Sequence, residues 1–161
     1  ERELKSEIER SAHAKVAVLF IDVDDFKFIN DRFGHSVGDE VIKYVAGCIK
    51  QRVKGSGFAG RFGGDEFVLC ITDPKQIEEI ESLSLDLIDE LYEGYHSELA
   101  NVSINVKASI GIAFFPEHGD DSNKVVAAAD EAMYFVKKNG KANYHIYQPE
   151  DSDMEDLQHT L

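Results

Sequence analysis

A pair of glycines followed by two carboxylates lies near the middle of the chain, in the run Arg61-Phe62-Gly63-Gly64-Asp65-Glu66-Phe67. Short apolar-alternating stretches flank the glycines, which predicts a tight hairpin whose two turn residues have positive φ. A turn without side chains lets backbone amides approach an anion closely, and adjacent carboxylates bind divalent cations. The run therefore predicts a site for a metal-bound nucleotide triphosphate.

A second acidic group, made of Asp22, Asp24 and Asp25, follows the apolar residues 16–21. The uninterrupted apolar run predicts a strand that is buried on both faces. On an extended chain Asp22 and Asp24 point to one side and Asp25 to the other. Mg²⁺ usually takes one or two carboxylates, with phosphate and water as its other ligands, so Asp22 and one carboxylate of the glycine turn would suffice. The alternative is that one group is a polar strand exit and the other a solvated turn.

The elements that must position these residues follow the order strand, helix, strand, strand, helix, strand, and a further helix and strand come last. We expect them at residues 16–21, 36–49, 58–62, 65–71, 73–99, 102–115, 122–138 and 144–147. This order is the ferredoxin-like split βαβ pattern, an α/β fold (an α+β sandwich) with a mostly antiparallel central sheet flanked by helices. A right-handed crossover makes the first two strands parallel, with the third antiparallel between them. Asp22 is therefore expected to meet Gly63, Gly64, Asp65 and Glu66.

The composition is that of a single globular domain, with 161 residues, 43% hydrophobic and 30% charged. No stretch approaches the roughly 20 apolar residues of a membrane helix, and the charged start is not a signal peptide. Cys48 and Cys70 lie in apolar surroundings without metal or redox spacing, which is typical of buried reduced thiols. We therefore expect a cytoplasmic domain. Because the chain begins with Glu, we also expect it to be a fragment, whose full-length protein can have a membrane anchor upstream.

The net charge of −14 is concentrated at residues 75–98 and 150–156. Nonspecific nucleic-acid binding depends on a basic surface, so nucleic acid is not an expected partner. The acidic stretches are most simply solvated faces and a polar tail. A polyphosphate remains compatible with this charge, because Mg²⁺ and a few local lysines can neutralise it.

Several spaced blocks of the sequence resemble one known family. Gly63-Gly64-Asp65-Glu66-Phe67 spells the GGDEF signature, residues 22–39 look like the other long motif of the GGDEF family, and residues 109–111 and 129–140 match its C-terminal half. The resemblance covers roughly residues 5 to 148. It implies a GGDEF domain at residues 13–148 with a fold like nucleotidyl cyclases and polymerase palms. Residues 1–12 would be the helical end of a linker from an upstream domain, and 149–161 an acidic tail.

The resemblance also implies an activity, that of a diguanylate cyclase in bacterial second-messenger signalling. Such domains join two GTP molecules into cyclic di-GMP and release two pyrophosphates. The reaction uses Mg²⁺, for which Mn²⁺ can substitute, and takes place across a transient homodimer in which each copy holds one GTP. A sensory or regulatory domain on the same polypeptide would control it.

By this resemblance Asp22, the backbone carbonyl of Val23 and Asp65 bind Mg²⁺, and Glu66 assists at a second metal. Asp65 would also be the base that frees the 3′-hydroxyl for attack on the α-phosphorus. Lys27 matches a lysine that faces the charge developing on the reacting phosphate.

The resemblance also implies which residues bind the nucleotide itself. Asn30, His35 and Asp39 match the guanine pocket, and an Asp can accept hydrogen bonds from N1 and N2 of guanine, which adenine does not offer. Asp39 alternatively stabilises the start of a helix through the helix dipole. The amides of Gly63 and Gly64 are suited to phosphates, because no Cβ blocks close approach.

Lys137 and Lys141 fall where the family places cations for the β- and γ-phosphates. The alternative is that they are lysines favoured at a helix C-terminus by its dipole. The family often has Gly-Arg-Asn where this chain has Gly140-Lys141-Ala142. Lysine keeps the charge but lacks the bidentate fork of arginine, so we expect a looser grip on the triphosphate.

A second departure concerns regulation. Many relatives carry an Arg-x-x-Asp product-inhibition site shortly before the signature glycines, and its two key positions here are Lys54 and Gly57. We therefore expect no high-affinity feedback inhibition by cyclic di-GMP through that site. The alternative function is a non-catalytic GGDEF module that binds GTP or mediates dimerisation to regulate an attached domain. Degenerate modules of that kind typically lose the signature carboxylates or the first-strand Asp, whereas this chain keeps them.

Overall fold

The computed structural model describes residues 5–6, 15–53, 55 and 57–152, and its main sheet has the strand order β2-β3-β1-β6-β7. Strand β3 is antiparallel to β1 and β2, β6 is antiparallel to β1, and β7 joins β6 in parallel. The strand bounds are Val16–Val23 (β1), Gly57–Arg61 (β2), Glu66–Thr72 (β3), Ala108–Phe115 (β6) and Tyr144–Ile146 (β7). The predicted ferredoxin-like core, with the third strand between the first two, is confirmed.

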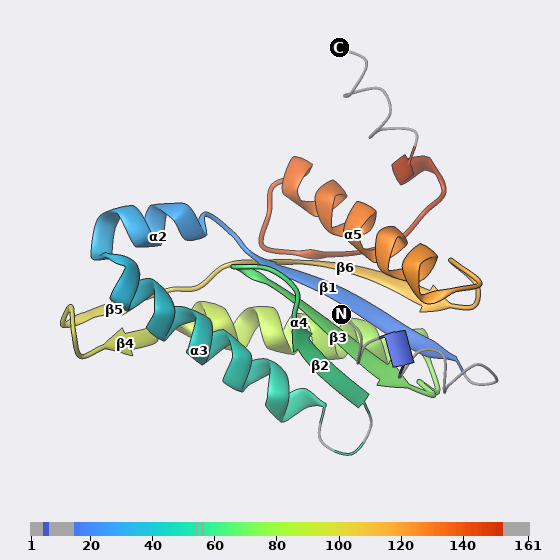
Figure 1. Cartoon of the computed structure of the whole chain (residues 1–161), viewed down its shortest axis with the longest axis horizontal. Coiled ribbons are helices and arrows are strands. Elements are labelled where there is room, and N and C mark those ends of the chain that lie inside the picture. Colours follow the sequence, from blue (N-terminus) through green and yellow to red (C-terminus); the bar gives the residue numbers. More distant parts are fainter. Residues whose placement is uncertain (1–4, 7–14, 54, 56, 153–161) are drawn as a thin grey trace, which may run out of the picture.

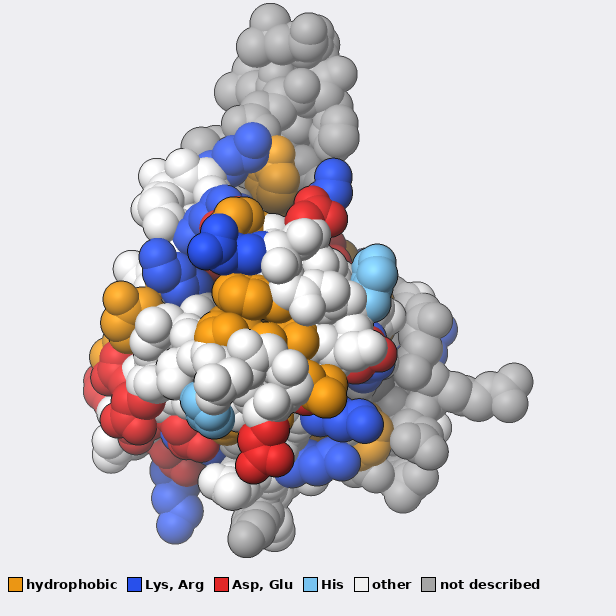
Figure 2. All heavy atoms as spheres, turned by 90° about the vertical axis from the view of Figure 1, so that its left-hand side faces the viewer, with side chains coloured by type: hydrophobic (Ala, Val, Ile, Leu, Met, Phe, Trp, Pro, Cys, Tyr) orange, Lys and Arg blue, Asp and Glu red, His pale blue; other side chains and the backbone are white. Residues whose placement is uncertain are grey.

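Helices cover both faces of this sheet. Figure 1 shows α5 (Ser122–Lys138) on one face, and α3 (His35–Arg52) and α4 (Ile77–Glu93) on the other. Helix α2 (Phe26–Phe33) projects beyond the end of β1, on the face that Figure 2 shows. No helix in the described ranges is long and apolar enough to span a membrane.

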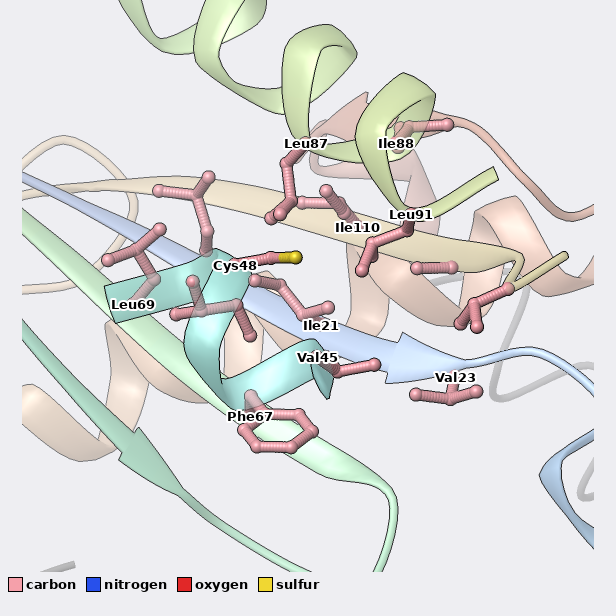
Figure 3. Packing of buried hydrophobic residues seen from close by; sticks show 14 of the residues in the cluster. Ile21, Val23, Val45, Cys48, Phe67, Leu69, Leu87, Ile88, Leu91 and Ile110 are labelled. Atoms are coloured by element: carbon pink, nitrogen blue, oxygen red, sulfur yellow. The ribbon is translucent and has the colours of Figure 1, made fainter. Parts of the chain in front are cut away.

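Strand β1 is apolar from Val16 to Ile21 because both of its faces are buried there. Ala17, Leu19 and Ile21 pack in a cluster with α3 and α4, whereas Val18 and Phe20 pack in a second cluster with α5. Figure 3 shows the first cluster, in which residues of α3 and α4 meet side chains from the sheet. The two packed layers fix the position of this central strand, and with it the position of the acidic residues at its C-terminal end.

Two regions differ from the sequence-based expectation. Helix α2 was not predicted, because its eight residues contain only one that is buried, Ile29. The helix predicted for residues 73–99 is shorter, since α4 ends at Gly94, whose φ of 105° favours glycine. Strands β4 (Tyr95–Ser97) and β5 (Val102–Ile104) follow it and form a separate two-stranded sheet.

The start of the acidic tail packs against the domain. Asp151 is buried; its side chain lies 3.1 Å from Nε2 of His145 and accepts a hydrogen bond from the backbone N–H of Gln148. Ser152 donates a hydrogen bond to Glu131 of α5. Residues 153–161, and most of the predicted linker end at 1–12, lie outside the described residues.

Candidate active site

The ends of β1 and β3 bring the two acidic groups together, as the strand order predicts. Asp22 lies opposite Glu66 in the antiparallel register, and the N–H of Val23 donates to the carbonyl of Asp65 at 3.1 Å. The signature turn therefore lies directly beside the end of the first strand. The pairing of β1 with β3 thus places Asp22 opposite Glu66, a residue 44 positions later in the chain (66 − 22).

The turn itself is held by Arg61, whose guanidinium donates to the carbonyls of Gly63 and Gly64 at 3.1 and 2.5 Å. The prediction of a two-residue turn with positive φ is wrong. Residues 62–65 connect β2 to β3, and neither glycine has a positive φ. A Cβ at Gly63 would lie 3.0 Å from Oε2 of Glu66, so the turn passes close to that side chain. The Gly63 N–H points back to the Glu66 carbonyl at 3.3 Å, so it is not aimed at a phosphate.

Asp22 lies in an unfavourable environment for a carboxylate. Its side chain is 16% exposed, and its Oδ1 atom is buried without a hydrogen-bond partner. Burial raises the pKa of Asp22 from 3.8 to about 7; Lys137 opposes the rise, while the neighbouring carboxylates of Asp65 and Glu66 add to it. A bound cation would remove both the repulsion and the unpartnered oxygen.

The residues present fit a magnesium ion chemically, because the unpartnered oxygen and two further carboxylates are hard oxygen ligands. Within the described ranges, no three His, Cys, Asp or Glu side chains are already arranged to hold a metal. Asp22, Asp65, Glu66 and the carbonyl of Val23 therefore remain the predicted ligand set. They would have to close around the ion.

The predicted guanine-binding residues come from α2 and the start of α3. Asn30 lies in α2, His35 is the first residue of α3, and Asp39 follows one turn later with an exposed side chain. A Cβ on Gly38 would lie 1.8 Å from Oδ1 of Asn30, so the Asn30 amide packs directly on the helix that carries Asp39. The structure thus brings Asn30 and Asp39 close together. Lys27 is exposed in the first turn of α2.

The two predicted phosphate lysines both reach the end of β1. The Nζ atom of Lys137 lies 2.5 Å from Oδ1 of Asp24 and 3.5 Å from Oδ2 of Asp22. Lys141 lies 2.8 Å from Oδ1 of Asp25. In Figure 2, cationic side chains gather in the upper half of the face, where α5 ends.

Comparison with known proteins identifies the architecture. The family model described as "Diguanylate cyclase, GGDEF domain" matches residues 1–143. The chain belongs to the GGDEF domain family. As a GGDEF domain it is homologous to diguanylate cyclases at about 30% identity, as the relatives below illustrate.

The relatives of this GGDEF domain include both whole proteins and a solved domain. Diguanylate cyclase DosC of Escherichia coli K12 is 34% identical over 134 residues, 83% of this chain, and cyclic di-GMP phosphodiesterase PdeR of the same strain is 32% identical over 143 residues, 89% of this chain. The chain spans only 28% and 21% of their lengths. The GGDEF domain of PA1120 (TpbB or YfiN) from Pseudomonas aeruginosa superposes with a TM-score of 0.85 at 30% identity, covering 96% of this chain and 88% of that one.

Three residues of the GGDEF domain were not assigned a role from the sequence. Asp24 is buried and accepts hydrogen bonds from Ser109 and Lys137. Lys107 is exposed, and together with Lys137 it adds to the lowering of the Asp25 pKa, which a hydrogen bond from Lys141 mainly causes. Ser109 stands in a block that matches the family, but only the register of β1 with β6 places it next to the acidic segment.

The position of the product-inhibition motif is also constrained by the fold. Gly57 begins β2, and a Cβ there would lie 1.9 Å from the carbonyl oxygen of Cys70 on β3. The strand pairing of this GGDEF domain therefore leaves no room for a side chain where many relatives carry an aspartate. Lys54 lies outside the described residues.

Proposed function

We propose that this GGDEF domain is an active diguanylate cyclase, which condenses two GTP molecules into cyclic di-GMP and two pyrophosphates. The observation that carries the proposal is the placement of Asp22, with its unpartnered buried oxygen, beside the turn that holds Asp65 and Glu66. Without a cation this arrangement is unfavourable, because Asp65 and Glu66 repel the ionised form of Asp22 and its Oδ1 atom is buried without a partner. It becomes favourable when a cation and a polyphosphate bind.

Each set of side chains would have a distinct task. Asn30, His35 and Asp39 would hold guanine, while Lys137 and Lys141 would bind the β- and γ-phosphates and Lys27 would face the charge on the reacting phosphate. Mg²⁺, or Mn²⁺ in its place, would stabilise charge on the attacking and leaving oxygens when held by Asp22, Asp65, Glu66 and the Val23 carbonyl.

The chemistry proceeds by attack of a 3′-hydroxyl oxygen on the α-phosphorus of the other GTP. Asp65 would accept the hydroxyl proton as the new O–P bond forms, and the bond to pyrophosphate breaks. Two such steps close the ring. Because each copy of the domain would hold one GTP, the reaction needs a second copy of the same chain, and a regulatory domain on the same polypeptide would control their encounter.

The test is GTP turnover at high protein concentration with Mg²⁺, followed by chromatographic detection of cyclic di-GMP. We expect product from the wild type and a loss of at least about a hundredfold in Asp65→Asn. Asp89→Asn, an equal charge change on the exposed side of α4, is the matched control and should retain activity. A wild type that binds GTP but makes no cyclic di-GMP would instead identify a non-catalytic regulatory module.

A further inference from the structure

Asp24 is the most completely partnered acid of the site, although it is not among the predicted ligands of the metal or the nucleotide. Its side chain is 0% exposed. Oδ1 accepts from Ser109 Oγ at 2.7 Å and from Lys137 Nζ at 2.5 Å, and Oδ2 accepts from the N–H of Ala142 at 2.9 Å. One carboxylate thus links β6, the end of α5 and the loop that follows.

The same carboxylate decides where the ammonium of Lys137 lies. Lys137 is 2.5 Å from Asp24 but 3.5 Å from Asp22, so it is bonded to the first and only near the second. If Asp24 lacked its charge, the unsatisfied carboxylate of Asp22 would be the strongest remaining partner for the ammonium. An ammonium has three protons, and Asp24 takes one of them. The others remain available to phosphate oxygens.

The loop after α5 depends on Asp24 as well. Lys141 and Ala142 both have positive φ, 62° and 49°, which is unfavourable for residues with a Cβ. The hydrogen bond from the Ala142 N–H to Asp24 fixes this backbone. Lys141 is therefore carried on a loop that is tied to the same buried carboxylate.

We propose that Asp24 is a positioning residue for the triphosphate of the bound nucleotide, holding Lys137 away from Asp22 and setting the loop of Lys141. The proposal rests on the proposed function, since it takes these lysines as the cations of the β- and γ-phosphates. Asp24 itself touches neither substrate nor metal. A merely structural role would instead stabilise the fold and affect all nucleotides alike.

The test measures binding by calorimetry with Mg²⁺ and nucleotides that cannot react, namely 3′-deoxyguanosine triphosphate and monophosphate. Asp24→Asn should lower the affinity for the triphosphate about tenfold, as expected for the loss of a charge-assisted hydrogen bond. It should lower the affinity for the monophosphate by less than about twofold. In a Lys137→Met background the same substitution should change triphosphate binding by less than about threefold, because a residue that acts mainly through Lys137 loses most of its effect without it.

Two further variants keep the test decisive. Asp89→Asn should alter neither affinity. Ser109→Ala removes only the hydroxyl that donates a hydrogen bond to Asp24. It should lower the affinity for the triphosphate selectively, by about twofold to threefold, and it provides a test even if Asp24→Asn does not fold.

The proposal would be overturned if Asp24→Asn lowered the affinities for both nucleotides equally. It would also be overturned if Asp24→Asn lowered triphosphate affinity as much in the Lys137→Met background as in the wild type. If these results came with a wild type that makes cyclic di-GMP, the cyclase assignment would stand and only the role of Asp24 would fall. A wild type that binds neither nucleotide would overturn both.

Discussion

The acids at the end of β1 occupy very different environments, although the first and the last are only three positions apart. The side chains of Asp22, Asp24 and Asp25 are 16%, 0% and 61% exposed, respectively. Asp24 is fully partnered, Asp25 forms an exposed ion pair with Lys141, and Asp22 alone retains an unpartnered buried oxygen. The three side chains are of the same type, so it is burial and the lack of a partner for Oδ1 that identify Asp22 as the carboxylate that needs a cation.

We expect Asp22→Asn to stabilise the domain in a chelator at pH 8. The folded-state pKa of about 7 exceeds the ordinary 3.8, so folding is opposed once pH rises through this interval and the carboxylate ionises. The gain should be on the order of 1 to 2 kcal/mol, or a few degrees in Tm, and should vanish near pH 3.5. Thermal unfolding measures it; a lower Tm for the variant at pH 8 would contradict the prediction. Mg²⁺ should raise the Tm of the wild type only.

Gly38→Ala should impair guanine-nucleotide binding, because its Cβ would lie 1.8 Å from Oδ1 of Asn30 and displace that amide. We expect GTP affinity to fall by about tenfold, the effect of losing one hydrogen bond to a buried polar group. Gly47→Ala on the same helix is the matched control, since its Cβ would meet nothing within 4 Å. It should leave binding unchanged and stabilise the helix by up to about 1 kcal/mol. Unaltered GTP binding by Gly38→Ala would refute the assigned position of Asn30.

At the scale of elements, the connection from β6 leads into α5, the helix that carries Lys137. His118 lies in this connection and packs beside Phe114 and Tyr147. Its Nδ1 atom accepts a hydrogen bond from the backbone N–H of Phe114 at 2.9 Å. The following helix begins with Asp121, whose side chain accepts the N–H of Lys124. The Nδ1 atom of His118 accepts a hydrogen bond, so this connection contains a neutral imidazole.

Acidification should weaken this connection. Burial lowers the pKa of His118 while Glu117 acts against the change, so the stabilising contribution exists above the ordinary value of 6.5 and is lost as pH falls through the lowered one. Urea unfolding between pH 7 and 5 should show a steeper loss of stability for the wild type than for His118→Asn, by less than about 1.4 kcal/mol per pH unit. Asparagine keeps an acceptor near the place of Nδ1 and does not titrate. Parallel pH profiles for the two proteins would contradict the prediction.

The elements that the sequence could predict are those with a clear apolar period. The buried strands, the hairpin and α5 follow directly from such periods. The right-handed crossover between the first two strands then predicts that Asp22 lies beside Glu66, as the structure shows. Helix α2 and strand β4 were not predicted, because few of their residues are buried, and the strand predicted for residues 102–115 is divided into β5 and β6. The partners of Asp24 were also unpredictable, since they depend on where the ends of α5 and β6 pack, and no local pattern records that.

At the scale of the whole molecule, the domain should lack the product feedback of many relatives. Gly57 leaves no room for a side chain, because its Cβ would lie 1.9 Å from the Cys70 carbonyl. We expect calorimetry to find no cyclic di-GMP binding tighter than about 1 μM, a free energy of roughly −8 kcal/mol. Submicromolar binding that Lys54→Ala abolishes would contradict this prediction. Turnover in the presence of added product should therefore continue at its initial rate.

The anchoring of Lys137 and Ala142 to the end of β1 has a consequence for the synthesis of the protein. Asp24 bonds to residues 113 and 118 positions further along the chain. Ribosomes deliver the N-terminal part first, so a nascent chain carries the acids of β1 and the glycine hairpin well before it carries their cations. The proposed nucleotide site would be complete only after α5 has left the exit tunnel. If the proposed activity holds, chains whose translation aborts earlier would therefore make no cyclic di-GMP.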